Sequence, residues 1–397
     1  MSEAPERVAS STSISAYYLC LFVAIGAYGP FMAVDFAARG VSPVRLADAL
    51  AISPVVRVLV GPLWAAAADR MRSATWALRA STSLAAAAFL GVVIAPSAST
   101  LVLAMVVYAA LRAPVGALID TVNLHRAQHA GGSFGALRMW GTVGYMLAVL
   151  LTGALVSRGR IEAVRWVSLA GIALAAASTY RMPVVLGRER VALRPALRAL
   201  ARRPRFVAIL AAGMLHQVGL AAYDGLFALH LTRLGGGAAA SYAIALGTAC
   251  EVAVMFHAQR VIARLGVDRA LLLSFLVGAA RWLVVAASRS VPVLVLAQSA
   301  HAISFGLYFV AAVAGIDREA PVEVRASAQG IQMAAVWGVA SALSLRLAGA
   351  LGGADAIGRV FSAGALGSLA AAAIVAAAGR ANPPGGPRGG LIAPAGP

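Results

Sequence analysis

The chain has 397 residues, of which 61% are hydrophobic and only 12% are charged. Soluble domains carry about 25% charged residues, so this composition excludes an ordinary soluble protein and predicts a membrane protein. All basic residues are arginines and the net charge is +18, but the sequence contains no zinc knuckle, basic helix or aromatic–basic platform, so we expect no nucleic-acid partner.

Apolar runs of about 20 residues, the length of a membrane-spanning helix, recur twelve times. The expected fold class is therefore an all-α membrane protein with twelve transmembrane helices. The segments cover residues 16–36, 46–67, 74–95, 99–122, 134–156, 162–181, 206–231, 241–262, 269–288, 291–314, 324–349 and 355–378.

The two ends of the chain are polar. Residues 1–15 lack the basic region and cleavage site of a signal peptide, so we expect a cytoplasmic tail followed by a first helix that remains as an anchor. Residues 379–397 are rich in proline and glycine, and a disordered cytoplasmic tail is expected there.

The arginines predict the orientation in a bacterial cytoplasmic membrane. With both termini in the cytoplasm, twenty arginines would lie on the inner side and nine on the outer side, which agrees with the positive-inside rule. Residues 182–205 form the longest and most basic connection. This linker would divide the chain into two six-helix bundles, 16–181 and 206–378, as in transporters built from two repeats.

Four motifs carry a resemblance to a known family. In chain order they are Trp64-Ala-Ala-Ala-Ala-Asp69-Arg70, Gly135-Ala-Leu-Arg138-Met-Trp140-Gly141-Thr-Val-Gly144, Gln298-Ser-Ala-His301-Ala-Ile-Ser-Phe305-Gly306 and Arg325-Ala-Ser-Ala-Gln329. They resemble the major facilitator superfamily, in the branch of phenylpropionate permeases, nucleoside–proton symporters and lactose permease. The resemblance implies a transporter rather than an enzyme, with Asp69 and Arg70 as a conformational gate.

Asp120 and Arg138 are expected to meet across a helical hairpin, because they lie near the facing ends of two consecutive apolar segments. In lactose permease an acid–arginine pair on these helices binds the sugar. By resemblance Arg138 takes the arginine role, and Asp120 is an approximate match for the acid. The alternative is a structural ion pair that locks the hairpin.

Two further arginines of the first half lie inside apolar segments. Arg57 is bracketed by Pro54 and Pro62 and is expected to face the cavity or another helix, because a lipid-facing charge is costly. Arg112 precedes Asp120 by two helical turns, roughly 12 Å. It either anchors an anion in the cavity or extends to the outer interface.

The second half contributes Asp224, Glu251, Arg281 and His301 as intramembrane polar residues. Glu251 lies among apolar neighbours, which disfavour a charged carboxylate and make it a candidate proton carrier. Arg281 and His301 match the coupling arginine and histidine of lactose permease in spacing, but Ser304 stands where that permease has its proton-carrying glutamate. Proton transfer would therefore fall to Glu251 or Asp224. The alternative for His301 is a histidine that only packs between helices, and the alternative for Glu251 is a buried salt bridge.

The sequence favours a monomeric, proton-coupled symporter that moves a small molecule across the lipid bilayer by alternating access. The arginines favour a small carboxylate, and a nucleoside or sugar is the close alternative. Trp140 and Tyr223 could stack on a cyclic substrate. A proton-driven exporter and a non-transporting membrane sensor remain open. A cofactor and a metal site are not expected. ATP-driven transport is not expected either, since the chain has no lysine for a P-loop.

Overall fold

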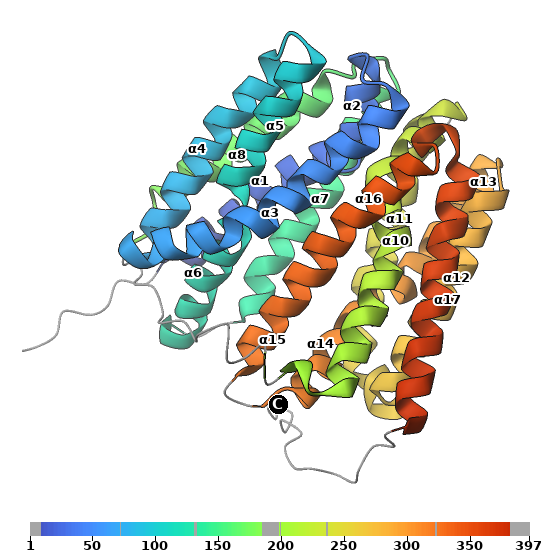
Figure 1. Ribbon diagram of the computed structural model, residues 1–397. Helices are drawn as coiled ribbons and strands as arrows, with labels where there is room; N and C mark the ends of the chain where they lie inside the picture. Colours follow the sequence, from blue (N-terminus) through green and yellow to red (C-terminus); the bar gives the residue numbers. More distant parts are fainter. Residues whose placement is uncertain are drawn as a thin grey trace, which may run out of the picture.

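The computed structural model describes residues 9–71, 73–130, 133–184, 198, 200–235, 237–321 and 324–381. Helices account for nearly all of this described part and run side by side in two groups, as Figure 1 shows. Ten continuous helical stretches are long and apolar enough to cross a membrane, and Ala163–Thr179 is a shorter apolar helix. With α3, a helix of 29 residues, they account for the twelve predicted segments. The chain is thus a multi-pass, all-α membrane protein.

The first half comprises eight helices in six membrane segments. They are α1 (Ser11–Tyr28), α2 (Met32–Ala38), α3 (Pro43–Met71), α4 (Ala74–Ile94), α5 (Ala98–Arg112), α6 (Val115–Ala130), α7 (Phe134–Val156) and α8 (Ala163–Thr179). Serine side chains cap four of the helix starts, because a hydroxyl can accept a bond from the free N–H groups of the first turn. Ser10, before α1, accepts from Ser13. Ser73 accepts from Trp76, Ser97 from Thr100 and Ser133 from Ala136.

The second half also forms six membrane segments. The α-helices are α10 (Pro204–Arg233), α11 (Gly237–Leu265), α12 (Val267–Ala287), α13 (Val291–Leu296), α14 (Tyr308–Glu319), α15 (Arg325–Gln332), α16 (Ser341–Ala350) and α17 (Ile357–Ala381). Between α13 and α14 lie the 3₁₀-helix η1 (Ala297–Ala300) and the π-helix η2 (Ala302–Leu307). Between α15 and α16 lies the π-helix η4 (Met333–Ala340), and the 3₁₀-helix η5 (Gly353–Asp355) precedes α17.

Two segments of the first half are interrupted by proline. Pro30 separates α1 from α2, and Pro114 separates α5 from α6. A proline has no N–H for the helical ladder, and its ring clashes with the preceding turn. Both breaks occur at membrane depth, where freed backbone groups need a protein or cavity environment. Pro30 lines the cavity between the two halves, and so does Arg112, which precedes the second interruption.

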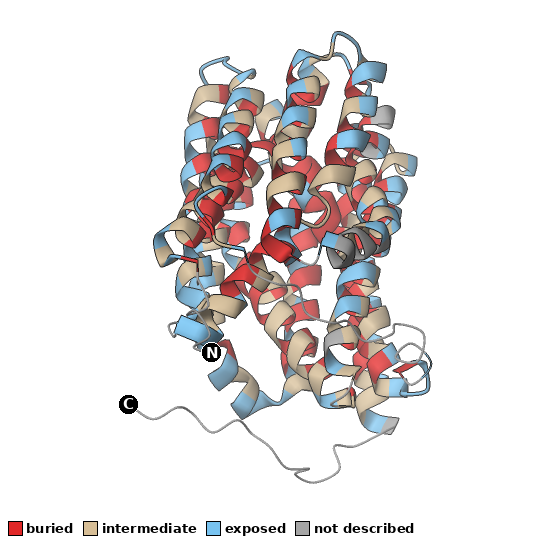
Figure 2. Ribbon diagram, turned by 90° about the vertical axis from the view of Figure 1, so that its left-hand side faces the viewer, coloured by how far each residue is buried: buried red, intermediate tan, exposed pale blue. Residues whose placement is uncertain are grey.

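Glycines bring the helices of each half close together. Gly144 of α7 faces the backbone of Leu19 in α1, and Gly171 of α8 faces the backbone of the same helix. In the second half, Gly219 of α10 packs against the indole of Trp282, a fully buried side chain of α12. Small residues allow this close backbone packing, which drives helix association in lipid, where the hydrophobic effect does not act between helices. Figure 2 shows the resulting buried residues along the middle of the bundle.

The two halves meet mainly through α3 with α16 and through α7 with α11. Arg346, in the middle of α16, donates to Asp48, near the start of α3, over 2.6 Å. Gly153, near the end of α7, lies directly against Ser241, near the start of α11. Both contacts lie at the end of the molecule opposite to the start of α1 and the end of α17 (Figure 1). The halves are thus held together at that end.

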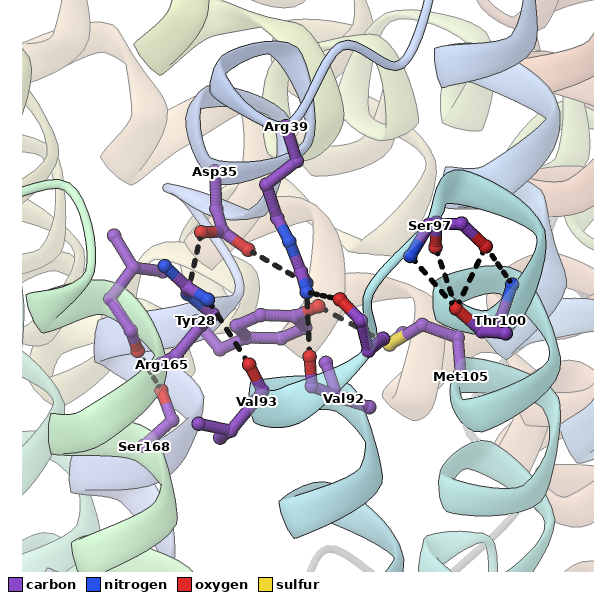
Figure 3. Close-up of polar contacts among 12 residues, drawn as sticks. Tyr28, Asp35, Arg39, Val92, Val93, Ser97, Thr100, Met105, Arg165 and Ser168 are labelled. Carbon is purple, nitrogen blue, oxygen red and sulfur yellow. Dashed lines mark hydrogen bonds and ion pairs between the residues drawn. The ribbon is translucent and has the colours of Figure 1, made fainter.

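A buried carboxylate clamps the same end of the first half. Asp35 of α2 has a side chain that is 1% exposed, and its oxygens lie 3.0 Å from Arg165 Nε and 3.8 Å from Arg39 Nη1. Arg39 also donates to the carbonyls of Val92 and Ala95 at the end of α4. Figure 3 shows both arginines converging on Asp35. This cluster, which we call the Asp35 clamp, joins α2, α4 and α8.

Candidate functional site

A central cavity of about 370 Å³ lies between the two halves. Both halves contribute its wall, with α1, α3, α5 and α7 on one side and α10, α11, η4 and α16 on the other. The residues that line it are Ile25, Gly29, Pro30, Met32, Leu50, Pro54, Arg57, Arg112, Tyr145, Gln217, Ala221, Tyr223, Asp224, Gly225, Ala228, Ile244, Trp337, Ser341 and Leu345.

Three charged residues line the cavity: Arg57 and Arg112 from the first half and Asp224 from the second. Arg57 and Asp224 are exposed and Arg112 is half-buried, and Arg57 and Arg112 are close enough to repel each other electrostatically. None of the three has an ion-pair partner within the described residues. The structure thus places both Arg57 and Arg112 on the wall of the cavity, and their role in substrate binding stays a prediction.

Aromatic and neutral polar groups complete the wall. Tyr145 of α7, Tyr223 of α10 and Trp337 of η4 present rings to the cavity. Gln217 donates to Ser341 over 2.9 Å and ties α10 to the start of α16. A cavity with apolar and aromatic walls and a few charged groups is typical of a small-molecule site.

Arg281 lies behind Tyr223, in a pocket of neutral acceptors. Its side chain is buried, and its guanidinium donates to Gln298 Oε1 over 3.1 Å and 2.5 Å. It also donates to His301 Nδ1 over 3.0 Å and to Ser304 Oγ over 3.2 Å. The guanidinium carbon lies 4.3 Å from the ring centroid of Tyr223, an aromatic contact that stabilises a desolvated cation.

The bond from Arg281 assigns the tautomer of His301. Because a guanidinium can only donate, Nδ1 of His301 must accept, and the ring proton of the neutral histidine lies on Nε2. That nitrogen is 3.3 Å from Oε2 of Glu251. His301 also stacks on Phe305, with ring centroids 4.9 Å apart. The structure therefore brings Glu251, His301 and Arg281 together in one chain of polar contacts, which Asp224 joins electrostatically.

Asp120 and Arg138 form an ion pair outside the central cavity. Their atoms approach to 3.1 Å, and the side chains are 39% and 48% exposed. Tyr18 donates to Asp120 over 2.6 Å, so the pair also links α1 to α6 and α7. The structure brings the two residues together as expected but does not place them on the wall of the cavity. Their role in substrate binding stays a prediction.

Of three other predicted residues, the structure places the side chain of only one, Trp140. Trp140 is 45% exposed on α7 and does not line the cavity. Asp69 and Arg70 belong to the last turn of α3, but their side chains lie outside the described residues. The conformational gate predicted for them is therefore untested.

The structure adds polar residues that the sequence analysis did not assign to a site. No motif or spacing in the sequence links Gln217 to Ser341, so their contact could not have been predicted. Gln298 stood in a quoted motif, and its position three residues before His301 could have marked it. Asp35 lies inside an apolar segment four residues before Arg39, and that spacing on one helix face was a usable signal.

Comparison with known proteins identifies the family of the chain. The profile of the MFS_1 like family matches residues 11–363. The maltose permease of Geobacillus stearothermophilus is 29% identical over 331 residues, covering 82% of this chain and 84% of the permease. The probable 3-phenylpropionic acid transporter of Escherichia coli (strain K12) is 26% identical over 355 residues, covering 87% and 88%.

A solved structure shares the fold. The nucleoside transporter NupG superposes with a TM-score of 0.81 at 17% identity, covering 92% of this chain and 98% of NupG. The fold has two six-helix bundles around a central cavity, and the related proteins are transporters rather than enzymes. The chain is therefore a secondary transporter of the major facilitator type and belongs to the MFS_1 like family.

Proposed function

We propose that the chain is a proton-coupled symporter that takes up a small organic carboxylate by alternating access. The observation that carries this proposal is the presence of two arginines, Arg57 and Arg112, in the central cavity without an ion-pair partner among the described residues. An anionic substrate would supply the missing negative charge. The proposal has three parts: the substrate, the proton and the movement.

The substrate part rests on electrostatics. A charge at membrane depth costs several kcal/mol, and two neighbouring cations repel each other as well. A carboxylate bound between Arg57 and Arg112 would relieve both costs through charge-assisted hydrogen bonds, which guanidinium groups form in a planar, bidentate geometry. An uncharged sugar or nucleoside would leave both arginines without a counter-charge, so the cavity favours the acid.

The shape of the cavity narrows the substrate class. Its volume of about 370 Å³ is near the lower end of the range for small-molecule sites, about 300–1,000 Å³. The rings of Tyr145, Tyr223 and Trp337 supply flat apolar surface. An aromatic monocarboxylate satisfies these features together, with the acid on the arginines and the ring against the aromatic wall. One relative is named as a probable transporter of such an acid, 3-phenylpropionic acid.

The proton part rests on Asp224, which faces the same cavity as the arginines. An ionised Asp224 would repel a bound carboxylate, and protonation would remove that repulsion. Proton and anion would therefore bind together, which is the requirement for symport. Glu251 and His301 would relay the proton, and Arg281 would hold His301 in the tautomer that faces Glu251.

The movement part uses the contacts at one end of the molecule. We place both termini in the cytoplasm, so that Asp48–Arg346 and Gly153–Ser241 close the outer side. Residues 16–181 and 206–378 would rock as two bodies joined by the linker 182–205. Opening to the outside would break these contacts and form others at the cytoplasmic ends.

Uptake into proteoliposomes tests the proposal. Labelled 3-phenylpropionate, maltose and uridine would be offered with and without an inward proton gradient, and with a protonophore as control. We expect gradient-driven accumulation of the acid alone. Asp224→Asn and Glu251→Gln should abolish accumulation but keep exchange of internal for external substrate, because exchange needs binding and movement without net proton transfer.

Arginine variants separate binding from coupling. Arg57→Gln and Arg112→Gln should each raise KM by about tenfold to hundredfold, the value of a hydrogen bond to a charged group. Arg158→Gln, an exposed residue that follows α7 and lies outside the cavity, is the matched control and should behave as the wild type. Accumulation without a gradient would refute proton coupling. Gradient-driven efflux from loaded vesicles would instead identify an exporter.

A further inference from the structure

A second cavity, of about 580 Å³, lies in the second half alone. It is formed where α12 begins and where α14 and α17 end, at the end of the molecule that we place in the cytoplasm. We call it the basic pocket. Its lining residues are Leu265, Gly266, Val267, Asp268, Arg269, Leu272, Arg318, Val375, Ala376, Gly379 and Arg380.

Three arginines from three helices surround the basic pocket. Arg269 begins α12, Arg318 ends α14 and Arg380 ends α17, and all three are exposed. None of them has an ion-pair partner within the described residues. Their positive charges therefore converge on one space from separate elements, which distinguishes the pocket from a row of arginines along one helix face.

The acid of the basic pocket does not neutralise these arginines. Asp268 is already bonded to Arg205 at the start of α10. Arg205 also lies 3.5 Å from Glu319 at the end of α14. The acidic groups next to the pocket are thus engaged by a different cation, and the pocket keeps a surplus of positive charge.

The remaining wall is apolar and lies deeper in the bundle. Leu272 is one turn further along α12, and Val375 and Ala376 lie one turn before Arg380 on α17. A charged rim at the helix ends and an apolar wall toward the membrane centre match an anionic phospholipid, whose phosphate lies above its acyl chains. Basic pockets between transmembrane helices on the cytoplasmic side recognise such head groups.

We propose that the basic pocket binds a phosphate group, supplied by an anionic phospholipid of the inner leaflet. The phosphate bridges Arg269, Arg318 and Arg380 and so ties together the ends of α12, α14 and α17. This site is separate from the central cavity and requires no particular transported substrate. Its occupant stabilises the second bundle beside the contacts of Arg205 with Asp268 and Glu319.

Thermal unfolding of the purified full chain in a mild detergent tests the proposal. The probes are dioleoyl phosphatidylglycerol, dioleoyl phosphatidylcholine and inorganic phosphate, and native mass spectrometry counts the bound lipids. Phosphatidylglycerol should raise Tm and remain bound, whereas phosphatidylcholine, whose phosphate is neutralised by choline, should do neither. If inorganic phosphate raises Tm and displaces phosphatidylglycerol, the phosphate site is supported and free phosphate becomes its source.

Two triple variants provide the matched comparison. Arg269→Gln, Arg318→Gln and Arg380→Gln together should weaken phosphatidylglycerol binding by about fivefold per arginine, or about a hundredfold in total. The control triple changes three exposed arginines of the opposite end, Arg158→Gln, Arg160→Gln and Arg289→Gln, and should bind as the wild type. Each Tm shift is measured against the same variant without lipid. Equal stabilisation by phosphatidylcholine, or unchanged phosphatidylglycerol binding in the first triple, would overturn the proposal.

Discussion

The Asp35 clamp makes a strong prediction about stability. Asp35→Asn keeps the shape of the side chain but removes the charge that Arg39 and Arg165 share. The carboxylate is 1% exposed, and breaking one side of a buried ion pair costs about 3–5 kcal/mol, because the remaining charges are left without compensation. At about 2–4 °C per kcal/mol for a unit of this size, Tm should fall by about 6–20 °C.

The matched control is Asp317→Asn. Asp317 pairs with Arg325 over 3.6 Å, but the two side chains are 49% and 45% exposed, and exposed pairs contribute about 0–1 kcal/mol. Tm would be followed by intrinsic tryptophan fluorescence in detergent. In the double variant Asp35→Asn with Arg165→Gln, the loss should be smaller than the sum of the single losses, because both changes remove the same interaction. Equal falls for Asp35→Asn and Asp317→Asn would refute the reasoning.

Three further predictions follow from the helix packing and the polar contacts. Gly144→Ala should destabilise the chain by about 1–3 kcal/mol in the same unfolding assay, because a methyl group at Gly144 meets helix backbone. The control Gly116→Ala, with open space around the residue, should change the free energy of unfolding by no more than about 0.5 kcal/mol. Arg346→Gln removes the bond to Asp48 across the halves and should raise the outward-open population by up to about fivefold. Double electron–electron resonance between spin labels on the two halves would measure this population, and an unchanged distance distribution would argue against this role. Arg281→Lys should lower gradient-driven uptake at least tenfold without loss of protein yield, since a single ammonium cannot reproduce the forked bonds to neutral acceptors; normal uptake would count against positioning by the guanidinium.

The membrane segments could be predicted because the bilayer imposes a length on them. Residues 134–156 coincide with α7, and residues 74–95 differ from α4 by one residue. The largest error concerns residues 99–122, since the helix continues to Ala130. A helix that extends beyond the hydrocarbon becomes polar without ending, so an apolar run underestimates its length.

Local irregularities of the helices were harder to predict from the sequence. The interruption at Pro30 has a direct cause in the sequence, whereas the π-helices η2 and η4 leave the apolar pattern unchanged. They nevertheless decide the geometry of the site, because Trp337 of η4 reaches the cavity and packs on Phe305 of η2, with ring centroids 5.6 Å apart. Such π-helical turns are frequent at functional sites.

From the sequence, the site could be predicted only as a set of charged and polar residues whose burial in the membrane costs free energy. The contact between Asp120 and Arg138 followed from their positions at facing helix ends, but their place outside the central cavity depends on how the bundle closes around α6 and α7. Asp35 was missed because Arg39 and Arg165 lie next to the ends of apolar segments, where a charge is expected to face water and to need no partner. The structure instead turns both guanidinium groups inward.

The distribution of partners separates the intramembrane charges by role. Asp35 is matched by two arginines, and Arg281 is matched by neutral acceptors and aromatic rings. A charge that the protein itself compensates can remain in place throughout a transport cycle. Arg57, Arg112 and Asp224 face the cavity, and within the described residues no ion-pair partner compensates them. Since an uncompensated charge at this depth is costly, we propose that what enters the cavity supplies the compensation, an anion for the arginines and a proton for the aspartate.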